Sequence, residues 1–448
     1  MMINGENIMD QIIKWHKSYS EAFRKRLGMS HYGIYWVSFF KGILFILIIL
    51  ALVGCSTPAK ANDIVIPKYF FANEITSKTC SLNGVHGDGS WGEKYTPLEL
   101  DITIKKNYDH LMGLTEYNWN DDHTKRSNSI YVNHEKHTNR LALLHGIIVT
   151  AIANDTMDVQ GPLVAEVMVA WAEAGVFLNT LTVKEIRKLK EQGKVDKLCY
   201  GNSKAKGNKK CVSHKPHEAQ IFGATYIQQA YLIKDQFTKK QLKIVDKYID
   251  TLYDKYVEPW ALQELNGPKG FIQMSDSVIS VLAYLAWEDK PNKVAKWIKK
   301  GIKKADRVVY DDGYIHNSSF RGVRDVWYHS QGVNNLLGLY AIAELWGYKK
   351  FPAELKQRID KTVDILNLGL TDVEKYRERK DPSGLQNFTL DQSKAAYHVH
   401  QMAISLDWLI ENYTDRDHTI VAENGMWKSK KSQYFVDRNF GFEPKCMN

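Results

Sequence analysis

Hydrophobic residues recur every three or four positions along most of the chain, which is the spacing of helices with one buried face. Thr182 and Thr238 stand where N-cap residues are expected, and Pro291 and Pro352 stand at the start of two further segments. The pattern predicts helices over residues 164–178, 219–233, 240–256, 275–287, 292–305, 332–346, 353–366 and 390–410.

Strand-like alternation is confined to residues 63–71 and 307–315. Because the predicted helices come in pairs joined by brief polar links, we expect an all-α fold, an incomplete α/α toroid (α/α barrel) of antiparallel helix pairs. A flat helical-repeat solenoid is the alternative. One domain of catalytic size is expected.

The chain divides by composition into four parts. Residues 1–54 form an N-terminal segment with a signal or anchor, 55–94 an N-terminal arm, 95–412 the helical domain and 413–448 a C-terminal arm. The arms are rich in Gly, Asn and charged residues, which predicts loops that wrap the domain.

The first part carries an export signal. Residues 42–54 read GILFILIILALVG behind a basic stretch, and Cys55 follows directly. A small residue and a Cys after such a run resemble the lipobox of bacterial lipoproteins, in which Cys55 would be lipidated. Cleavage after Ala61 and an uncleaved anchor are the alternatives. All three place most of the chain in the periplasm or on the outer membrane, with the N-terminus or its lipid as the only membrane contact.

Composition and charge limit the kinds of partner that the chain is expected to bind. Of the 448 residues 44% are hydrophobic and 25% charged, as in folded globular proteins. The aromatic share of 12% fits either a sugar-binding surface or core packing. The net charge of +9 favours an anionic partner. Since export separates the chain from genomic DNA, we expect a polyanionic substrate and no nucleic acid.

Four cysteines follow Cys55. An even number in an exported chain predicts disulfides. Cys199 and Cys211 flank a Gly- and Lys-rich loop and would form a local clip, while Cys80 and Cys446 would tie the two ends together. The Cys-x-x-Cys pairs typical of zinc sites are absent from the sequence, so no metal is expected.

A loop at residues 311–329 carries the candidate chemistry. It delivers Arg321, Arg324, Trp327, Tyr328 and His329 just ahead of an apolar helix. Arg321 and Tyr328 are seven residues apart and would share a face if the segment were helical. In the alternative interpretation the aromatic residues belong to the core.

The two arginines would then pair with Asp311, Asp312 or Asp325.

The block Arg321-Gly-Val-Arg324-Asp-Val-Trp327-Tyr328-His329, after Asp312-Gly313, resembles the signature of the mannuronate-type alginate lyases, polysaccharide lyase family five. A weaker similarity extends over residues 95–412. The resemblance implies an incomplete α/α toroid, a periplasmic monomer, and cleavage of an anionic uronate polymer by β-elimination without metal or other cofactor.

By this resemblance Tyr328 is the catalytic base and then the acid, and Arg321 neutralises the substrate carboxylate or assists the tyrosine. Substrate-binding residues would be Arg324, His329, Gln273, Asn317 and Trp327.

The sequence departs from the family at the Asn-Asn-His motif, where Ile272-Gln273-Met274 stands instead. Possible substitutes for the missing imidazole are His214, His217, His398 and His400. A catalytically silent, envelope-anchored polysaccharide-binding protein is therefore the alternative function. A glycoside hydrolase would need two opposed carboxylates, and no pair stands out.

Lesser candidates are Asn334 and Asn335 near the loop, and His134, His137 and Arg140 as a basic wall or a solvated loop.

Overall fold

The computed structural model of the chain describes residues 64–70, 72, 75, 104–116, 134–178, 181–193, 197–198, 211–212, 216–266, 277–322, 325–381 and 406–424. The chain forms two compact units, Met1–Ala61 and Asn62–Asn448. All described residues belong to the second unit, so its boundary falls inside the expected N-terminal arm.

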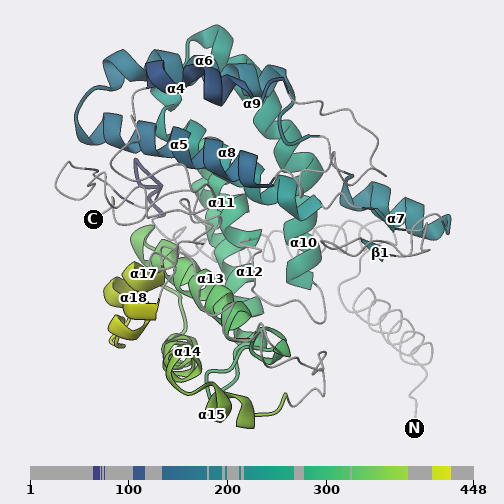
Figure 1. Ribbon diagram of the computed structural model, residues 1–448, viewed down its shortest axis with the longest axis vertical. Helices are drawn as coiled ribbons and strands as arrows, with labels where there is room; N and C mark the ends of the chain where they lie inside the picture. The colour runs from purple at the N-terminus through teal and green to yellow at the C-terminus, as the bar shows by residue number, and fades with distance from the viewer. Residues whose placement is uncertain are drawn as a thin grey trace, which may run out of the picture. The chain divides into compact units, whose positions relative to one another are not determined.

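The second unit is all-α, as the hydrophobic spacing predicts (Figure 1). Its helices are α4 (Ile104–Met112), α5 (His134–Ala153), α6 (Met157–Glu173), α7 (Val183–Glu191), α8 (Pro216–Leu232), α9 (Lys239–Leu252), α10 (Glu258–Asn266), α11 (Ser277–Trp287), α12 (Pro291–Val308), α13 (Asp325–Leu345), α14 (Ala353–Thr371), α15 (Val373–Glu378), α17 (Leu406–Tyr413) and α18 (Thr419–Asn424). Short 3₁₀ turns η2 (Lys234–Gln236) and η4 (Ser318–Phe320), a π-helical turn η3 (Tyr253–Val257) and the two-residue strands β1 (Lys197–Leu198) and β2 (Cys211–Val212) complete the described elements.

Local sequence signals set several helix starts. The Thr182 hydroxyl accepts from the Glu185 backbone N–H, and the Glu185 carboxylate accepts from the Thr182 N–H, a complete capping box. Thr238 and Gln241 form the same box ahead of α9. Pro291 opens α12 at a position where its missing N–H removes no helical hydrogen bond.

Five described helices, α4, α5, α10, α15 and α18, were not anticipated from the spacing. Arg140, expected in a loop, lies within α5 and donates from Nε to the His110 carbonyl at 2.6 Å, closing the end of α4. His134 and His137 are also helical, but their side chains lie outside the described set, as do residues 390–405 of the last predicted helix.

The strand predictions are wrong within the described residues. Val309 and Ile315 form one isolated bridge, and residues 64–70 are an irregular segment docked on the end of α13. The Trp346 indole N–H donates to the Phe70 carbonyl at 2.7 Å, and the Val65 N–H donates to the Trp346 carbonyl at 3.2 Å. The alternating pattern of residues 64–70 therefore reflects side chains that are buried to anchor this segment, and not a strand.

Three tryptophans lie deep in the core. Trp171, Trp287 and Trp346 are fully buried, and each indole N–H has an acceptor: the Leu111 carbonyl, the Asp246 carboxylate and the Phe70 carbonyl. Buried indoles normally find such partners because an unpaired N–H would be costly. For these residues the aromatic excess is explained by packing.

Cys55, Cys80, Cys199 and Cys446 lie outside the described residues, and Cys211 is described only as part of β2. β1 and β2 pair in parallel, with Lys197 opposite Cys211. This pairing joins the chain on either side of the Gly- and Lys-rich loop, where the Cys199–Cys211 disulfide stays a prediction. Within the described part of the chain, no helix is long and apolar enough to cross a membrane.

A glycine in the candidate loop offers a test of the fold. Gly313 has φ +87°, and a Cβ there would lie 2.5 Å from the Lys361 carbonyl oxygen on α14. We expect Gly313→Ala to lower the free energy of unfolding by about 3 kcal/mol or more, because backbone strain and a clash with rigid backbone add. Chemical denaturation measures the change.

The matched control is Gly193→Ala, with φ +63° and nothing within 4 Å of the added methyl. It should cost only the conformational strain, about 1 kcal/mol. Equal losses in both variants would contradict the predicted clash.

Candidate functional site

The candidate site lies where the loop of residues 309–322 meets the first turns of α13. Arg321 follows η4 directly, and its guanidinium carbon lies 4.0 Å from the centroid of the Tyr328 ring. This is cation–π distance. Arg321 precedes the start of α13 at Asp325, so the pair meets because the loop folds back and not because the two residues share a helix face.

Trp327 lies beside the Arg321–Tyr328 contact and packs against Tyr328. Their ring centroids are 4.6 Å apart, with the rings inclined by 48°. Both side chains and that of Arg321 are half-buried, so each keeps some contact with solvent. The structure thus brings together three of the predicted site residues, one cation and two amphipathic aromatics.

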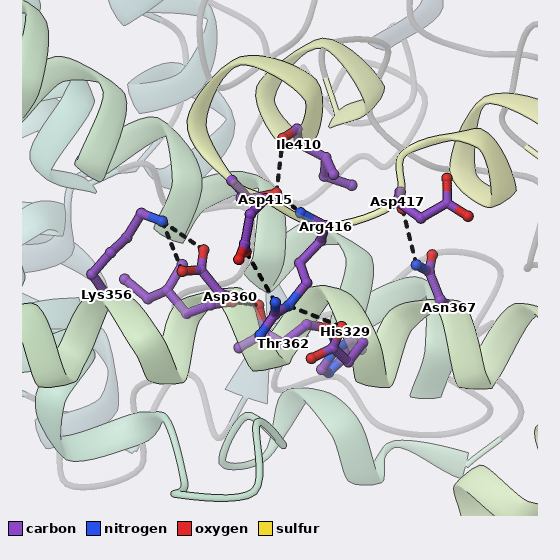
Figure 2. Close-up of polar contacts among 12 residues, drawn as sticks. His329, Lys356, Asp360, Thr362, Asn367, Ile410, Asp415, Arg416 and Asp417 are labelled. Carbon is purple, nitrogen blue, oxygen red and sulfur yellow. Dashed lines mark hydrogen bonds and ion pairs between the residues drawn. The ribbon is translucent and has the colours of Figure 1, made fainter.

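His329 points the other way, into the interior. It is fully buried, and its Nε2 lies 2.8 Å from the Thr362 carbonyl of α14 (Figure 2). Because a carbonyl only accepts, Nε2 carries the proton. The Nδ1, 2.7 Å from the Ser319 hydroxyl, then accepts from it. Burial lowers the pKa of His329 to about 4, so the ring is neutral near pH 7.

This corrects the role predicted for His329. Both of its ring nitrogens are used inside the chain, and the imidazole has no surface exposed to a substrate. It positions η4 and α13 against α14.

Residues of α15 bind η4 and the start of α13. Arg377 donates to both carboxylate oxygens of Asp325, at 2.8 and 3.1 Å, and Asp325 is buried at the start of α13. The Tyr376 hydroxyl donates to the Ser319 carbonyl at 3.0 Å, and the Tyr314 hydroxyl donates to the Tyr376 carbonyl at 2.8 Å. One short helix therefore fixes η4 and the start of α13 together.

In the alternative interpretation Arg321 and Arg324 would pair with nearby aspartates, but the ion pairs of these aspartates are with other arginines. Asp325 pairs with Arg377 at 2.8 Å, Asp312 with Arg379 at 2.7 Å, and Asp311 lies 3.9 Å from Arg358. The last two pairs are exposed on the aspartate side and contribute little energy.

Sequence reasoning missed a second polar cluster beside the loop. The Tyr310 hydroxyl lies 2.7 Å from His316 Nδ1 and 3.4 Å from an Asp381 oxygen. Burial and the Asp381 charge raise the pKa of Tyr310 to about 12, so it is a poor base. The only signal in the sequence is that Tyr310 and His316 bracket the Asp311-Asp312-Gly313 turn.

The structure describes only some of the remaining candidate residues. Asn317 has φ +64° and ψ −37° at the start of η4, and the Ser318 N–H donates to the His316 carbonyl at 2.8 Å, which is the geometry of a γ-turn and favours a turn role. Asn334 and Asn335 are buried within α13. The candidates that lie outside the described residues are Gln273, Arg324, His214, His398 and His400, together with the side chain of His217.

Among the described residues, no group of three or more His, Cys, Asp or Glu side chains could hold a metal ion. Comparison with protein-family models and with curated proteins gives no match to this chain.

The neutral state of His329 predicts a pH dependence of stability. Between pH 6.5, its ordinary pKa, and pH 4 the unfolded chain binds a proton that the folded chain excludes. The free energy of unfolding should therefore be highest above pH 6.5 and fall toward pH 4, by up to about 1.4 kcal/mol per pH unit from this residue. Buried His145, with a pKa of about 3, adds to the slope.

Denaturation across this range in His329→Gln should give a smaller slope than in the native chain. The control Ser319→Ala removes a hydrogen bond but no titrating group, so stability should drop with the slope retained. An unchanged slope in His329→Gln would show that another group causes the dependence.

Proposed function

We propose that this chain is a carbon–oxygen lyase that cleaves an anionic uronate polysaccharide, alginate or a polymannuronate-like polymer, by β-elimination. The observation that carries the proposal is the Arg321 guanidinium held 4.0 Å from the Tyr328 ring at the start of α13. A cation beside a half-exposed phenol is the pairing that the reaction needs, since the guanidinium can bind a substrate carboxylate next to the tyrosine that would transfer the proton.

In the proposed mechanism the Tyr328 phenolate takes the C5 proton of a uronate residue. The C5–H electron pair forms the C4–C5 double bond, and the C4–O4 bond breaks. The tyrosine then returns its proton to the departing O4, which regenerates the phenolate. A single group serves both steps because in a syn elimination both proton positions lie on one face of the sugar.

The C6 carboxylate must be neutralised before C5 becomes acidic enough. His329 is buried and neutral, so this task passes to arginine, whose planar fork matches a carboxylate. Arg321 is our choice, with Arg324 and Gln273 as further contacts. Trp327, half-buried beside Tyr328, would stack on a neighbouring sugar ring.

The proposed scaffold is the incomplete α/α toroid of antiparallel helix pairs. The packing of consecutive helices supports it: α11 lies against α12, α12 against α13, and α13 against α14. Short connections such as residues 288–290 between α11 and α12 favour antiparallel neighbours. Export to the periplasm or outer membrane, with a lipid on Cys55, would bring the protein to an extracellular polymer, as a monomer and without a cofactor.

The test is ultraviolet absorbance of the unsaturated uronate product. The chain truncated before Cys55 is incubated separately with polymannuronate, polyguluronate, glucuronan and hyaluronan. We expect a rise on one polymer, and a loss of at least about 100-fold in rate in Tyr328→Phe with polymer binding retained.

The control is Tyr284→Phe on α11, whose hydroxyl donates to Asp250 at 2.9 Å, away from the Arg321 contact. It should keep the native rate. Full activity in Tyr328→Phe would remove this residue from the mechanism, and binding without turnover on every polymer would favour the catalytically silent binding protein.

A further inference from the structure

α12 has two opposite faces of unusually different character. Its apolar face, which includes Val294, Ile298 and Ala305, is completely buried against the core. Its outward face carries Lys293, Lys296, Lys299, Lys300 and Lys303. All but the half-buried Lys300 are exposed, and they follow one another at intervals of one or three residues. A helix advances 1.5 Å per residue, so the row is about 15 Å long with at least one cation per turn.

Among the described residues, the ion pairs include none with Lys293, Lys296, Lys299 or Lys303. Asp306, the acidic residue of this helix, pairs with Arg358 of α14 instead. Lysines spaced three and four residues apart repel each other and destabilise a helix. Burial and the neighbouring charge of Lys296 lower the pKa of Lys300, against the opposing charge of Glu258 on α10.

Other surface helices of the chain are mixed in charge. On α14 Lys356 pairs with Asp360 one turn away at 2.6 Å (Figure 2), and on α9 the lysines alternate with Asp246 and Asp250. An ordinary solvated face would resemble these. The face of α12 does not, so solubility alone is a poor account of it.

Two further cations of α12, each four residues beyond a lysine of this row, have structural tasks at the end of the helix. Lys304 is buried and donates to the Glu264 carbonyl at 2.9 Å, and Arg307 donates to the Leu265 carbonyl at 2.9 Å. Both complete the end of α10, where carbonyls lack helical partners. Lys293, Lys296, Lys299 and Lys303 have no comparable task.

We propose that the lysine row on α12 (Lys293, Lys296, Lys299, Lys300 and Lys303) binds a stretch of the anionic polysaccharide outside the Tyr328–Arg321 site. The proposal rests on the proposed function for its choice of polymer. A linear polymer with one carboxylate per sugar matches a linear row with at least one ammonium per helical turn. Such a surface raises the local concentration of substrate and retains the polymer between cleavage events.

A bilayer surface is the weaker fit. Helices that lie on membranes insert apolar side chains beside their basic face. The apolar side chains of α12 are buried in the core, and among the described residues the exposed large hydrophobic side chains, Val65 and Val159, belong to other segments.

The experiment compares two variants with equal loss of charge. One carries Lys293→Gln, Lys296→Gln, Lys299→Gln and Lys303→Gln on α12. The other carries Lys239→Gln, Lys240→Gln, Lys243→Gln and Lys247→Gln on α9, where all four lysines are exposed on a mixed face. Both are made with Tyr328→Phe, so that binding of fluorescently labelled polymannuronate is measured without turnover. Thermal melts verify that both fold.

We expect the α12 variant to bind the polymer about tenfold more weakly or worse, with a smaller dependence of affinity on salt, because fewer counterions are released. The α9 variant should remain within about twofold of its Tyr328→Phe parent. With Tyr328 restored, the α12 variant should show a raised KM on long polymer and unchanged kcat, while short oligomers that cannot reach α12 are cleaved as before.

Equal losses in the two variants would overturn the proposal, since net charge would then be responsible. It would also be overturned if the α12 lysines governed binding to equimolar phosphatidylglycerol–phosphatidylcholine vesicles and not to the polymer. If the native chain binds polymannuronate through α12 but cleaves no polymer, the lysine row stands and the lyase proposal fails, so the two failures are distinguishable.

Discussion

The buried imidazole of His329 is the contact on which the geometry of the candidate site depends. It joins three elements, since it belongs to α13, accepts from Ser319 in η4 and donates to the Thr362 carbonyl of α14. Ser319 in turn accepts from the Ile315 N–H, so the chain of hydrogen bonds continues into the loop that delivers Arg321. Every member is buried, and such a network is stable only when it is fully satisfied.

The Asp325–Arg377 pair completes the support. Asp325 is buried at the start of α13, where its charge also suits the helix dipole. Losing one partner of a buried pair leaves the other charge without compensation, at a cost of about 3–5 kcal/mol. Together with His329 this pair fixes the backbone on both sides of the Arg321–Tyr328 contact. In the proposed lyase a rigid frame of this kind would keep Arg321 and Tyr328 aligned without help from the substrate.

Periodicity predicts most of the described helices because their buried faces are wide, and Thr182 and Thr238 mark two of the starts. It also brings Arg321 near Tyr328, but by a shared helix face, whereas in the structure the loop before α13 folds back to make the contact. Helical periodicity also argues against placing His329 in the same site as Tyr328. Consecutive helical residues point about 100° apart, so Tyr328 and His329 cannot both face one site. The hydrogen-bond partner of His329 on α14 could not be predicted from the sequence, because Thr362 is 33 residues away and every residue has a backbone carbonyl. Likewise, nothing local connects Arg377 with Asp325.

The inward histidine has a consequence for how charge is distributed over the molecule. A neutral, buried ring supplies no field to a polyanion, so in the proposed function attraction would come from permanently charged groups nearer the surface. Arg321 is one such group, and the lysines of α12 form a longer row of them. In the proposed lyase this arrangement would separate two tasks, alignment by buried hydrogen bonds and capture by exposed charge. Salt should therefore weaken capture far more than alignment, because exposed charges are screened and buried ones are not.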